Sequence, residues 1–460
     1  MNINDTIAAV STAMSESGIG IIRISGEDSI SIADRIYRSK GIKKRLSDQS
    51  SHTIHYGYIY DDNEMVDEVL VSVLRAPRSF TAEDTVEINC HGGIFAMRRV
   101  LETVLKNGAR IAEPGEFTKR AFLNGRIDLS QAEAVIDVIT AKNEYALKSS
   151  LSQLKGAVQE ALISLRKEIL YEIAYIESAL DDPEHISLDG FSMQLEEKNQ
   201  VWMKKLDHLI ESSENGRIMK EGIQTVIVGK PNAGKSSLLN LLVGEERAIV
   251  TDIAGTTRDI LAETVNLNGI MLNVVDTAGI RSTEDVIEKI GVERAREYVE
   301  KADLVIYVVD SSTPLDENDE EIIERIRGKK VIILQNKTDL NVVTSEEALR
   351  KKAGEHIILP ISARTQKGID LLENAVKEMF YHGEISFHDE VYISNIRQKN
   401  LLIEARESLN QVKESLSMGM AEDFISIDLM SAYESLGEIT GEKVGEDLIN
   451  EIFSKFCMGK

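Results

Sequence analysis

Apolar residues are spaced differently in successive parts of the chain, and the spacing predicts different elements. Residues 1–118 alternate short β-like runs, such as Gly20–Ile24 and Glu68–Leu74, with helical stretches. From residue 119 to 215, apolar side chains recur at every third or fourth position, which is typical of long amphipathic helices. The stripe formed by residues 147, 151, 154, 158, 162, 165, 169, 173, 176 and 180 should end at Asp181-Asp182-Pro183.

Residues 216–382 instead alternate strands with helices. Apolar runs predict a doubly wound sheet built from βαβ units, with strands at Ile223–Val228, Met271–Val275, Leu304–Val309, Val331–Leu334 and Ile357–Ile361. Helical spacing returns in residues 383–460, at Leu402, Ala405, Leu409, Val412 and Leu416, then at Val444, Leu448, Ile452 and Phe456.

The two helical segments each carry an apolar stripe that must be buried. We therefore expect residues 119–215 and 383–460 to pack on each other, with the α/β domain inserted between them. The predicted fold class is multidomain: an N-terminal α+β domain, a discontinuous helical domain and an inserted doubly wound domain.

Composition and charge narrow the choice of function. The 460 residues suggest about three domains. The net charge is −24, yet residues 1–125 are nearly neutral with 17 acidic and 15 basic residues, so most of the excess lies beyond them. This acidity argues against non-specific binding of nucleic acid, and any RNA contact must be local or shared with a partner.

Membrane and secretory signals are missing from the sequence. No apolar run approaches the roughly 20 residues of a membrane span, and the N-terminal residues do not resemble a signal peptide. Two cysteines, Cys90 and Cys457, are too few for a disulfide framework. We expect a soluble, cytoplasmic protein without membrane attachment.

Three short motifs follow one another in the α/β segment. Gly229-Lys-Pro-Asn-Ala-Gly-Lys-Ser236 is a complete phosphate loop between a strand-like run and a helix-like run. Its backbone N–H groups face phosphates, Lys235 supplies positive charge, and Ser236 offers a hydroxyl to Mg²⁺. In Asp276-Thr-Ala-Gly279, the carboxylate can hold the metal through water, and Gly279 leaves an N–H free to approach a γ-phosphate.

The third motif, Asn336-Lys-Thr-Asp339, selects guanine. The Asp339 carboxylate can accept from both N–H groups on the guanine edge, whereas adenine lacks that donor pair, so discrimination can reach roughly 10⁴-fold. Ser362-Ala-Arg364 fits a loop that closes over the base. A single motif would leave a chance phosphate loop as the alternative; three motifs in this order predict GTP binding and hydrolysis.

The whole chain resembles the MnmE (TrmE) family of tRNA-modification GTPases, which act with a flavoprotein on wobble uridines. The matching segments are Asn4–Ile7, Gly20–Gly26, Asp84–Gly93, Pro114–Asn124, Asp128–Ala134, Thr251–Asp259 and Cys457–Lys460. The departures are few: Met458 stands where Ile is usual, Arg126 where Lys often stands, and Asp181-Asp182-Pro183 replaces Asp-Phe-Pro.

The resemblance implies an organisation and a reaction. Residues 1–118 would bind folate and dimerise, residues 119–215 and 383–460 would form the helical domain, and residues 216–382 would be the inserted GTPase. The homodimer would assemble into a heterotetramer with an FAD- and NADH-dependent partner. Stimulated by K⁺, it would add an aminomethyl or carboxymethylaminomethyl group at C5 of the tRNA wobble uridine. The carbon would come from 5-formyl- or 5,10-methylene-tetrahydrofolate, with folate contacts from Arg23, Glu87, Arg126 and Lys460.

Two residues are candidates for catalysis. Ile280 stands where many small GTPases place a glutamine, so the attacking water must be oriented by another group. By resemblance that group is Glu288, whereas on the sequence alone it reads as a solvated carboxylate at a helix start. Cys457 could be a nucleophile, but an unpaired cysteine near a helix C-terminus is more often structural, and both readings stay open.

The expected metal ligands also follow the resemblance. Ser236 and Thr257 would bind Mg²⁺, and a K⁺ ion would be held by Asn232, Thr256 and the backbone oxygens of Thr251 and Ile253. That ion would sit where an arginine finger otherwise reaches, sealed when two GTPase domains meet. Without the resemblance, Asn232 reads as a loop residue that tolerates unusual backbone angles.

The predicted GTP-binding residues form five groups. They are Asn232, Ala233, Gly234, Lys235, Ser236 and Ser237; Thr251, Asp252, Ile253, Ala254, Gly255, Thr256 and Thr257; Asp276, Thr277, Ala278 and Gly279; Asn336, Lys337 and Asp339; and Ser362, Ala363 and Arg364.

Two other functions are consistent with a GTPase. A ribosome-assembly or other switch GTPase would perform no small-molecule chemistry, and normally carries a basic RNA-binding domain that the acidic helices do not provide. A mechanical GTPase controlled by dimerisation would also lack such chemistry. A test of folate binding by the N-terminal domain would distinguish this alternative from a member of the tRNA-modification family.

Overall fold

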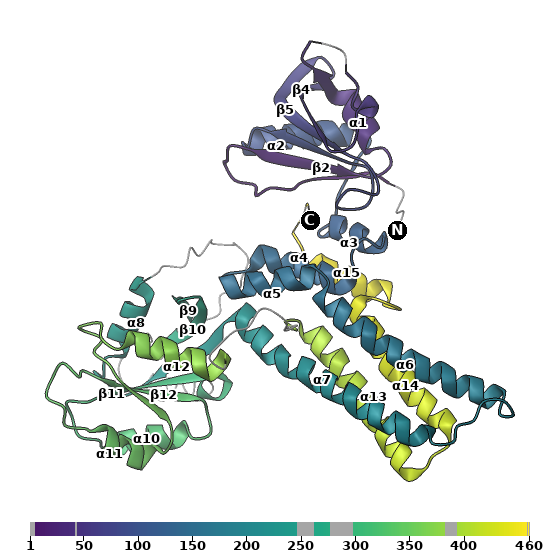
Figure 1. Ribbon diagram of the computed structural model, residues 1–460. Coiled ribbons are helices and arrows are strands. Elements are labelled where there is room, and N and C mark those ends of the chain that lie inside the picture. Colours follow the sequence, from purple (N-terminus) through teal and green to yellow (C-terminus); the bar gives the residue numbers. More distant parts are fainter. Residues whose placement is uncertain are drawn as a thin grey trace. The chain divides into compact units, whose positions relative to one another are not determined.

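The computed structural model describes residues 5–41, 44–245, 262–276, 298–381, 393–457 and 459 (Figure 1). The chain forms two compact units. The first contains residues 1–140, 150–204 and 400–460, and the second contains residues 141–149 and 205–399. The unit boundaries at residues 149, 204 and 399 fall inside helices α5 (Glu144–Leu154), α7 (Phe191–Glu221) and α13 (Ile396–Met418).

A seven-stranded sheet of order β3-β4-β5-β6-β2-β1-β7 organises the N-terminal part of the first unit. Its strands are β1 (Ile7–Val10), β2 (Gly20–Ser25), β3 (Tyr37–Ser39), β4 (Thr53–Asp61), β5 (Glu64–Leu74), β6 (Thr85–Cys90) and β7 (Arg110–Ile111). Neighbours are antiparallel except β1 and β7, which are parallel. Buried Val69, Val71 and Val73 alternate along β5 and pack with helices α1 (Ser29–Ile36) and α2 (Ile94–Lys106).

The opposite face of this sheet is only partly covered. Phe117 of α3 (Glu116–Leu123) and Phe80 pack with Ile7 and Ala9 at the β1 end. Towards β4 and β5, the side chains of Ile54, Leu70 and Tyr56 remain 66%, 46% and 40% exposed. Apolar side chains are therefore left uncovered on one half of this face.

Helices form the remainder of the first unit. They include α4 (Leu129–Thr140), α6 (Ala157–Asp181), α14 (Glu422–Thr440) and α15 (Glu446–Ser454), with parts of α5, α7 and α13. Buried Asn199 of α7 donates to the carbonyl of Leu409 in α13 at 2.9 Å, and Arg166 of α6 pairs with Glu442 just after α14. The packing between the two helical segments that their apolar stripes predict is thus present.

The apolar stripe of residues 147–180 is carried by two helices rather than one. Helix α5 ends at Leu154 and α6 begins at Ala157, and Gly156 between them has a φ of +96°. Only glycine adopts this left-handed backbone conformation without strain. Because the conformation is not helical, the helix is interrupted at Gly156. Helix α6 ends at Asp181, where Asp181-Asp182-Pro183 was expected to stop it.

The second unit contains a six-stranded sheet of order β13-β12-β11-β8-β10-β9. The strands are β8 (Ile223–Val228), β9 (Ala262–Leu267), β10 (Ile270–Asp276), β11 (Leu304–Asp310), β12 (Val331–Asn336) and β13 (Ile357–Pro360). All pairs are parallel except β9 with β10. The chain leaves β8 for β10 on one side and later returns to β11 on the other, which creates the switch point where ligands bind in such folds.

Helices cover both faces of this sheet (Figure 1). One buried cluster joins β-strand residues such as Ile306 and Leu334 to α8 (Lys235–Glu245) and α12 (Ile369–Tyr381). The other joins Val305 and Tyr307 to α10 (Glu317–Arg325) and α11 (Glu346–Ala353). The period-two alternation along buried strands thus gives the doubly wound domain that the sequence predicts.

Candidate functional site

The phosphate loop connects β8 to α8 at the switch point of the second sheet. Its glycines allow close backbone approach, because a Cβ on Gly229 would lie 2.4 Å from the carbonyl oxygen of Val308. A Cβ on Gly234 would lie 2.1 Å from the Asn336 amide nitrogen. Asn232 is exposed and has a φ of +62°, which supports its reading as a loop-shaping residue.

The loop lysine is held by the loop's own backbone. The Lys235 ammonium donates to the carbonyls of Gly229 at 2.7 Å and Lys230 at 2.8 Å. Ser236 and Ser237 follow in the first turn of α8 and are exposed. Because the first N–H groups of a helix have no partners within it, this turn is suited to anionic phosphates.

Asn336 joins the phosphate loop to the segment predicted to cover the base. Its side chain is buried at the end of β12, where its amide nitrogen donates to the carbonyl of Ala233 at 2.9 Å. Its amide oxygen accepts from the backbone N–H of Ala363 at 3.0 Å. The structure therefore brings together three predicted groups, although Asn336 is 103 residues from Ala233 and 27 residues from Ala363 in the sequence.

Asp339 and Ser362, which come from two different predicted motifs, are hydrogen-bonded to each other. The Ser362 hydroxyl donates to one carboxylate oxygen of Asp339 at 2.7 Å, and this bond keeps the pKa of Asp339 below its usual value. The positive charge of exposed Arg364 also lowers the pKa of Asp339, by a smaller amount. The carboxylate is thus ionised and oriented, which is consistent with its predicted recognition of the two guanine N–H groups.

Asp310 is a residue of this site that the sequence analysis missed. It ends β11 and accepts from the Lys337 ammonium at 2.6 Å. Burial alone would raise the pKa of Asp310, but hydrogen bonds from Lys337 and Ser312 outweigh burial and lower it. Asp310 could have been found from its position at the end of a predicted strand, because β8, β10, β11 and β12 all end at the same edge of the sheet.

Part of the predicted site lies outside the described residues. This applies to Thr251–Thr257, Thr277–Gly279 and Glu288, and so to Thr257 and the backbone oxygens expected to bind metal. Asp276 ends β10 next to β8, with Asp276 in register with Ile227. The roles of these residues remain predictions.

A second predicted group gathers on the first unit's sheet. The Arg23 guanidinium donates to the Glu87 carboxylate at 2.9 Å and lies 5.6 Å from the ring centroids of Phe80 and Phe117. Arg126 donates to the carbonyl of Phe80 at 2.9 Å and stacks over the same ring. Two of the four predicted folate residues, Arg23 and Arg126, thus lie over one phenylalanine ring, and a third, Glu87, pairs with Arg23.

The C-terminal segment reaches this group. The carbonyl of Gly459 accepts from Arg23 at 3.3 Å and from the Ser11 hydroxyl at 3.1 Å. A Cβ at Gly459 would lie 2.3 Å from the carbonyl oxygen of Val10, so a glycine is needed for this approach. Lys460 lies outside the described residues, and Cys457 is exposed, with its carbonyl accepting from Gly115 at 3.3 Å.

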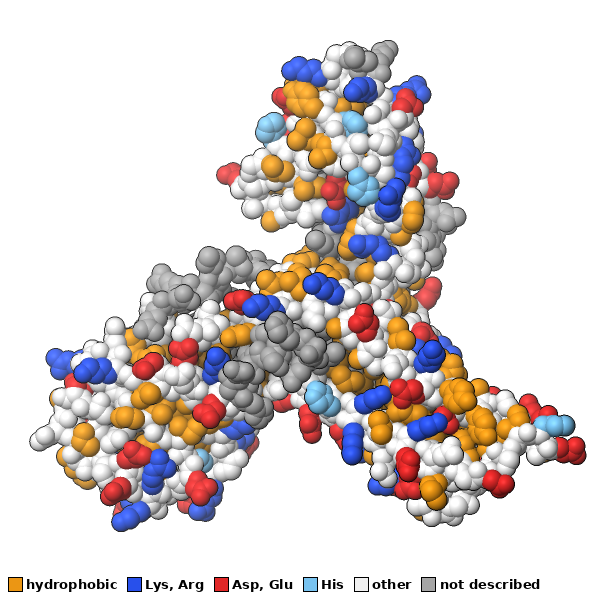
Figure 2. Space-filling model, in the orientation of Figure 1, with side chains coloured by type: hydrophobic (Ala, Val, Ile, Leu, Met, Phe, Trp, Pro, Cys, Tyr) orange, Lys and Arg blue, Asp and Glu red, His pale blue; other side chains and the backbone are white. Residues whose placement is uncertain are grey.

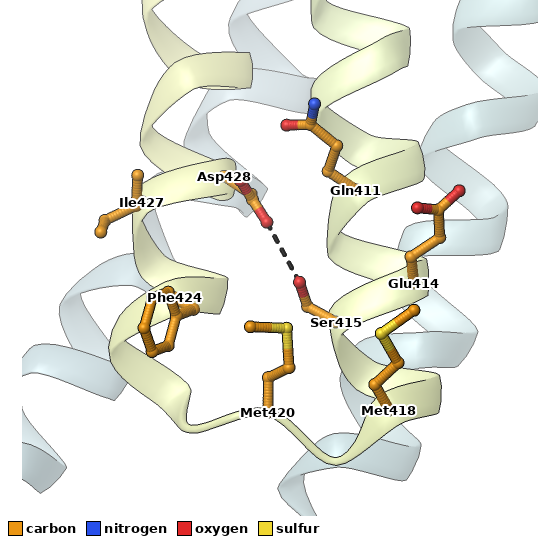
Figure 3. A pocket seen from close by; sticks show the side chains of 8 residues that line it. All are labelled: Gln411, Glu414, Ser415, Met418, Met420, Phe424, Ile427 and Asp428. Atoms are coloured by element: carbon orange, nitrogen blue, oxygen red, sulfur yellow. Dashed lines mark hydrogen bonds between the residues drawn. The ribbon is translucent and has the colours of Figure 1, made fainter.

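A separate hollow of about 280 Å³ lies between α13 and α14 (Figure 3). Met418, Met420 and Phe424 surround it, and Ser415 donates to Asp428 across it at 3.3 Å. It contains none of the predicted site residues. In the described parts of the chain, no helix is long and apolar enough to cross a membrane, and no group of three His, Cys, Asp or Glu residues could hold a metal.

Comparison with family models identifies two matches. Residues 6–126 match the GTP-binding protein TrmE N-terminus, and residues 129–457 match the MnmE helical domain. Together these matches cover almost the whole chain.

Curated relatives are similar over their full length. A protein of Lachnoclostridium phytofermentans named tRNA modification GTPase MnmE is 60% identical over 456 residues, covering 99% of both chains. Proteins of the same name from Listeria welshimeri and Bacillus cytotoxicus are 48% identical and also cover 99% of both chains.

Solved structures match a smaller part. Aquifex aeolicus Era bound to GDP·AlF₄⁻ is 30% identical, covering 40% of this chain and 65% of that chain, with a TM-score of 0.27. The FeoB G-domain from Methanococcus jannaschii is 28% identical, covering 35% of this chain and 97% of that chain, with a TM-score of 0.26.

Asp339→Asn should exchange guanine specificity for xanthine specificity. The amide offers a donor where the carboxylate only accepts, so GTP affinity should fall by roughly 10³-fold or more while XTP binding appears. Titration of the full chain with both nucleotides measures the exchange. Retained preference for GTP would mean that another group reads the base.

Proposed function

This chain belongs to the MnmE (TrmE) family of tRNA modification GTPases, and we propose that it modifies the wobble uridine of tRNA at C5. In this reaction a tetrahydrofolate derivative, 5-formyl or 5,10-methylene, supplies the one-carbon unit. An FAD- and NADH-dependent partner supplies the redox chemistry, and the product is the aminomethyl or carboxymethylaminomethyl uridine. The observation that carries this proposal is full-length similarity to curated relatives of that name, together with the assembled guanine and phosphate loops.

Mg²⁺ and K⁺ are proposed to bind at the phosphate loop. Exposed Ser236 offers a hydroxyl that suits Mg²⁺, and Thr257 would be its second protein ligand. Exposed Asn232 offers an amide oxygen, which fits a monovalent cation together with the oxygens of Thr251, Ile253 and Thr256. These residues would offset charge that develops on the phosphates, while Glu288 would orient the attacking water.

Folate binding is proposed for the group around Arg23. The donor face of a pterin suits the Glu87 carboxylate, and the acidic tail of the folate suits Arg126 and Lys460. Phe80 and Phe117 offer ring faces beside these charges. A charged pair that is mostly buried and bordered by aromatic rings is more consistent with a ligand site than with an ordinary surface ion pair.

A homodimer through the N-terminal sheet is supported by its uncovered face. The register aligns Ile54, Ser72, Glu87 and Arg23 in one row across β4, β5, β6 and β2. The exposed apolar side chains therefore lie on the same face as the proposed folate group. A second copy that covers this face would bury Ile54 and Leu70, which is the usual role of a large exposed apolar patch.

Contact with tRNA must be local on this acidic chain. On the face shown in Figure 2, Lys and Arg side chains are interspersed with Asp and Glu among the described residues. The net charge of −24 disfavours broad phosphate binding, so we propose that the partner protein shares the tRNA contact. The proposed location is the cytoplasm.

The decisive experiment is mass analysis of wobble nucleosides in tRNA from cells that lack this protein. The modified uridines should disappear, and the intact gene should restore them, whereas the Asp339→Asn gene should not. Unchanged nucleosides would remove the proposal and favour a ribosome-assembly or switch GTPase without small-molecule chemistry.

GTP hydrolysis should be much faster in K⁺ than in Na⁺, because a positive group beside the bridging oxygen is worth roughly 10³- to 10⁵-fold in other GTPases. Asn232→Gly should abolish this difference, since it removes the amide oxygen and still permits the φ of +62°. Asn232→Asp retains an oxygen and should keep part of the K⁺ effect.

The matched controls are Arg258→Ala and Arg281→Ala, which remove two arginines that lie close in sequence to the predicted nucleotide-binding residues and could instead act as an arginine finger. Turnover is measured in buffers that differ only in the cation. Equal rates in both salts, with activity lost in an arginine variant, would contradict the K⁺ proposal.

Arg23→Met should weaken binding of 5-formyl-tetrahydrofolate by about ten- to a hundredfold, the usual effect of losing charge-assisted hydrogen bonds. GTP turnover should be unchanged. The matched control is Arg99→Met, which removes an arginine of α2 that pairs with Asp61 and with Glu64, whose side chain is 75% exposed; this variant should bind folate normally. Isothermal titration of both variants checks the prediction, and normal folate affinity in Arg23→Met would contradict the assigned site.

A further inference from the structure

Lys230 is the second residue of the phosphate-loop motif, at a position where the motif accepts any residue. Its ammonium lies between two carboxylates, 2.7 Å from an oxygen of Asp319 and 3.0 Å from an oxygen of Asp316. The side chain is only 16% exposed. A lysine that merely occupied a free position of the loop would extend into water instead.

Both carboxylates belong to the start of α10. Asp316 is the N-cap and accepts from the backbone N–H groups of Asn318 and Asp319, while Asp319 accepts from the N–H of Asp316. This reciprocal arrangement is a capping box, which fixes the backbone of the first helical turn. The ammonium of Lys230 therefore binds to a rigid part of the fold.

Tyr307 of β11 extends the connection into the core. Its hydroxyl donates to the other oxygen of Asp319 at 2.7 Å, and both side chains are at most 1% exposed. Burial, followed by the hydrogen bond to Asp319, raises the pKa of Tyr307, so the phenol stays neutral and donates. Asp319 consequently receives hydrogen bonds from α10, β11 and the phosphate loop.

The charges explain why the lysine is held firmly. Burial alone would lower the pKa of Lys230, but hydrogen bonds to Asp319 and Asp316 outweigh burial and raise it. Without the ammonium, the buried Asp319 carboxylate would face the carboxylate of Asp316 with no positive charge between them, which is a costly arrangement.

The backbone of Lys230 is hydrogen-bonded within the phosphate loop. Its carbonyl accepts from the Lys235 ammonium and from the N–H of Ala233 at 3.2 Å. We propose that Lys230 is a positioning residue for GTP binding: by anchoring the start of the phosphate loop to α10 and β11 through Asp319, it orients the backbone N–H groups that receive the β-phosphate. This inference concerns nucleotide binding and does not depend on folate or K⁺.

The test measures nucleotide affinity of the full-length Lys230→Met protein, which keeps most of the aliphatic stem. Affinity for GDP and for a non-hydrolysable GTP analogue should fall by about five- to a hundredfold, because misplacing a binding group by about 1 Å can cost that much. GMP affinity should be unchanged, since GMP lacks the β-phosphate. In steady-state hydrolysis, KM should rise more than kcat falls.

Lys352→Met is the matched control. Lys352 also pairs with a carboxylate of α10, Glu320, but both side chains are substantially exposed and this pair joins α10 to α11 instead of to the phosphate loop. Its nucleotide affinities and turnover should equal those of the unaltered protein. If Lys352→Met weakened GDP binding as much as Lys230→Met, the effect would come from α10 charge in general and the proposal would fall.

Asp319→Asn provides a second route, which still decides the question if Lys230→Met does not fold. Asp319→Asn should also lower the affinity for GDP. The double variant should bind GDP as well as the more affected single variant does, because both changes break the same connection. Fully additive losses, unchanged GDP affinity, or an equal loss of GMP affinity would each overturn the proposal.

Discussion

The GTP site depends on the buried carboxamide of Asn336, which joins two of its loops. One side chain at the end of β12 accepts from Ala363 and donates to Ala233, so the base loop and the phosphate loop are held at a fixed separation. Removing the carboxamide would leave the buried backbone carbonyl of Ala233 without this hydrogen bond, which costs about 1–3 kcal/mol. The 2.1 Å approach that a Cβ on Gly234 would make to this amide explains why the loop requires glycine there.

Polar residues at the ends of parallel strands complete the same arrangement. Strands β8, β11 and β12 are parallel neighbours, so their carboxyl ends lie at one edge of the sheet. This edge holds Asp310 at the end of β11, Asn336 at the end of β12 and the loop after β8. Lys337 has a φ of +62° and binds Asp310, and Ser362 binds Asp339. Each hydrogen bond orients a group before the nucleotide arrives, so less conformational entropy is lost on binding.

The sequence predicted five of the six strands of this unit because buried parallel strands are continuous apolar runs, and it predicted the loops because their motifs are local. It missed β9, the antiparallel edge strand, in which polar and apolar residues alternate. It did not predict that Asn336 joins two loops, that Asp310 pairs with Lys337, or that Lys230 binds α10, since these contacts join residues distant in sequence. Helix α14 was a different kind of omission: Ile425, Leu429, Ala432 and Leu436 follow helical spacing, and the signal was available. The two-residue strand β7 offered no such signal.

The N-terminal sheet presents the opposite physical situation, because its polar pair lies on a face that remains partly open. Arg23 and Glu87 occupy the same cross-strand row as Ile54, which is 66% exposed. The side chains of Arg23 and Glu87 are 14% and 25% exposed, so water still reaches the edge of this ion pair. Excluding that water would strengthen every electrostatic interaction on the face, including those with a bound anion. The proposed folate site and the proposed dimer contact on one sheet face would thus be physically coupled: the apolar side chains would supply the driving force for association, and association would lower the dielectric constant around the charges proposed to bind the ligand.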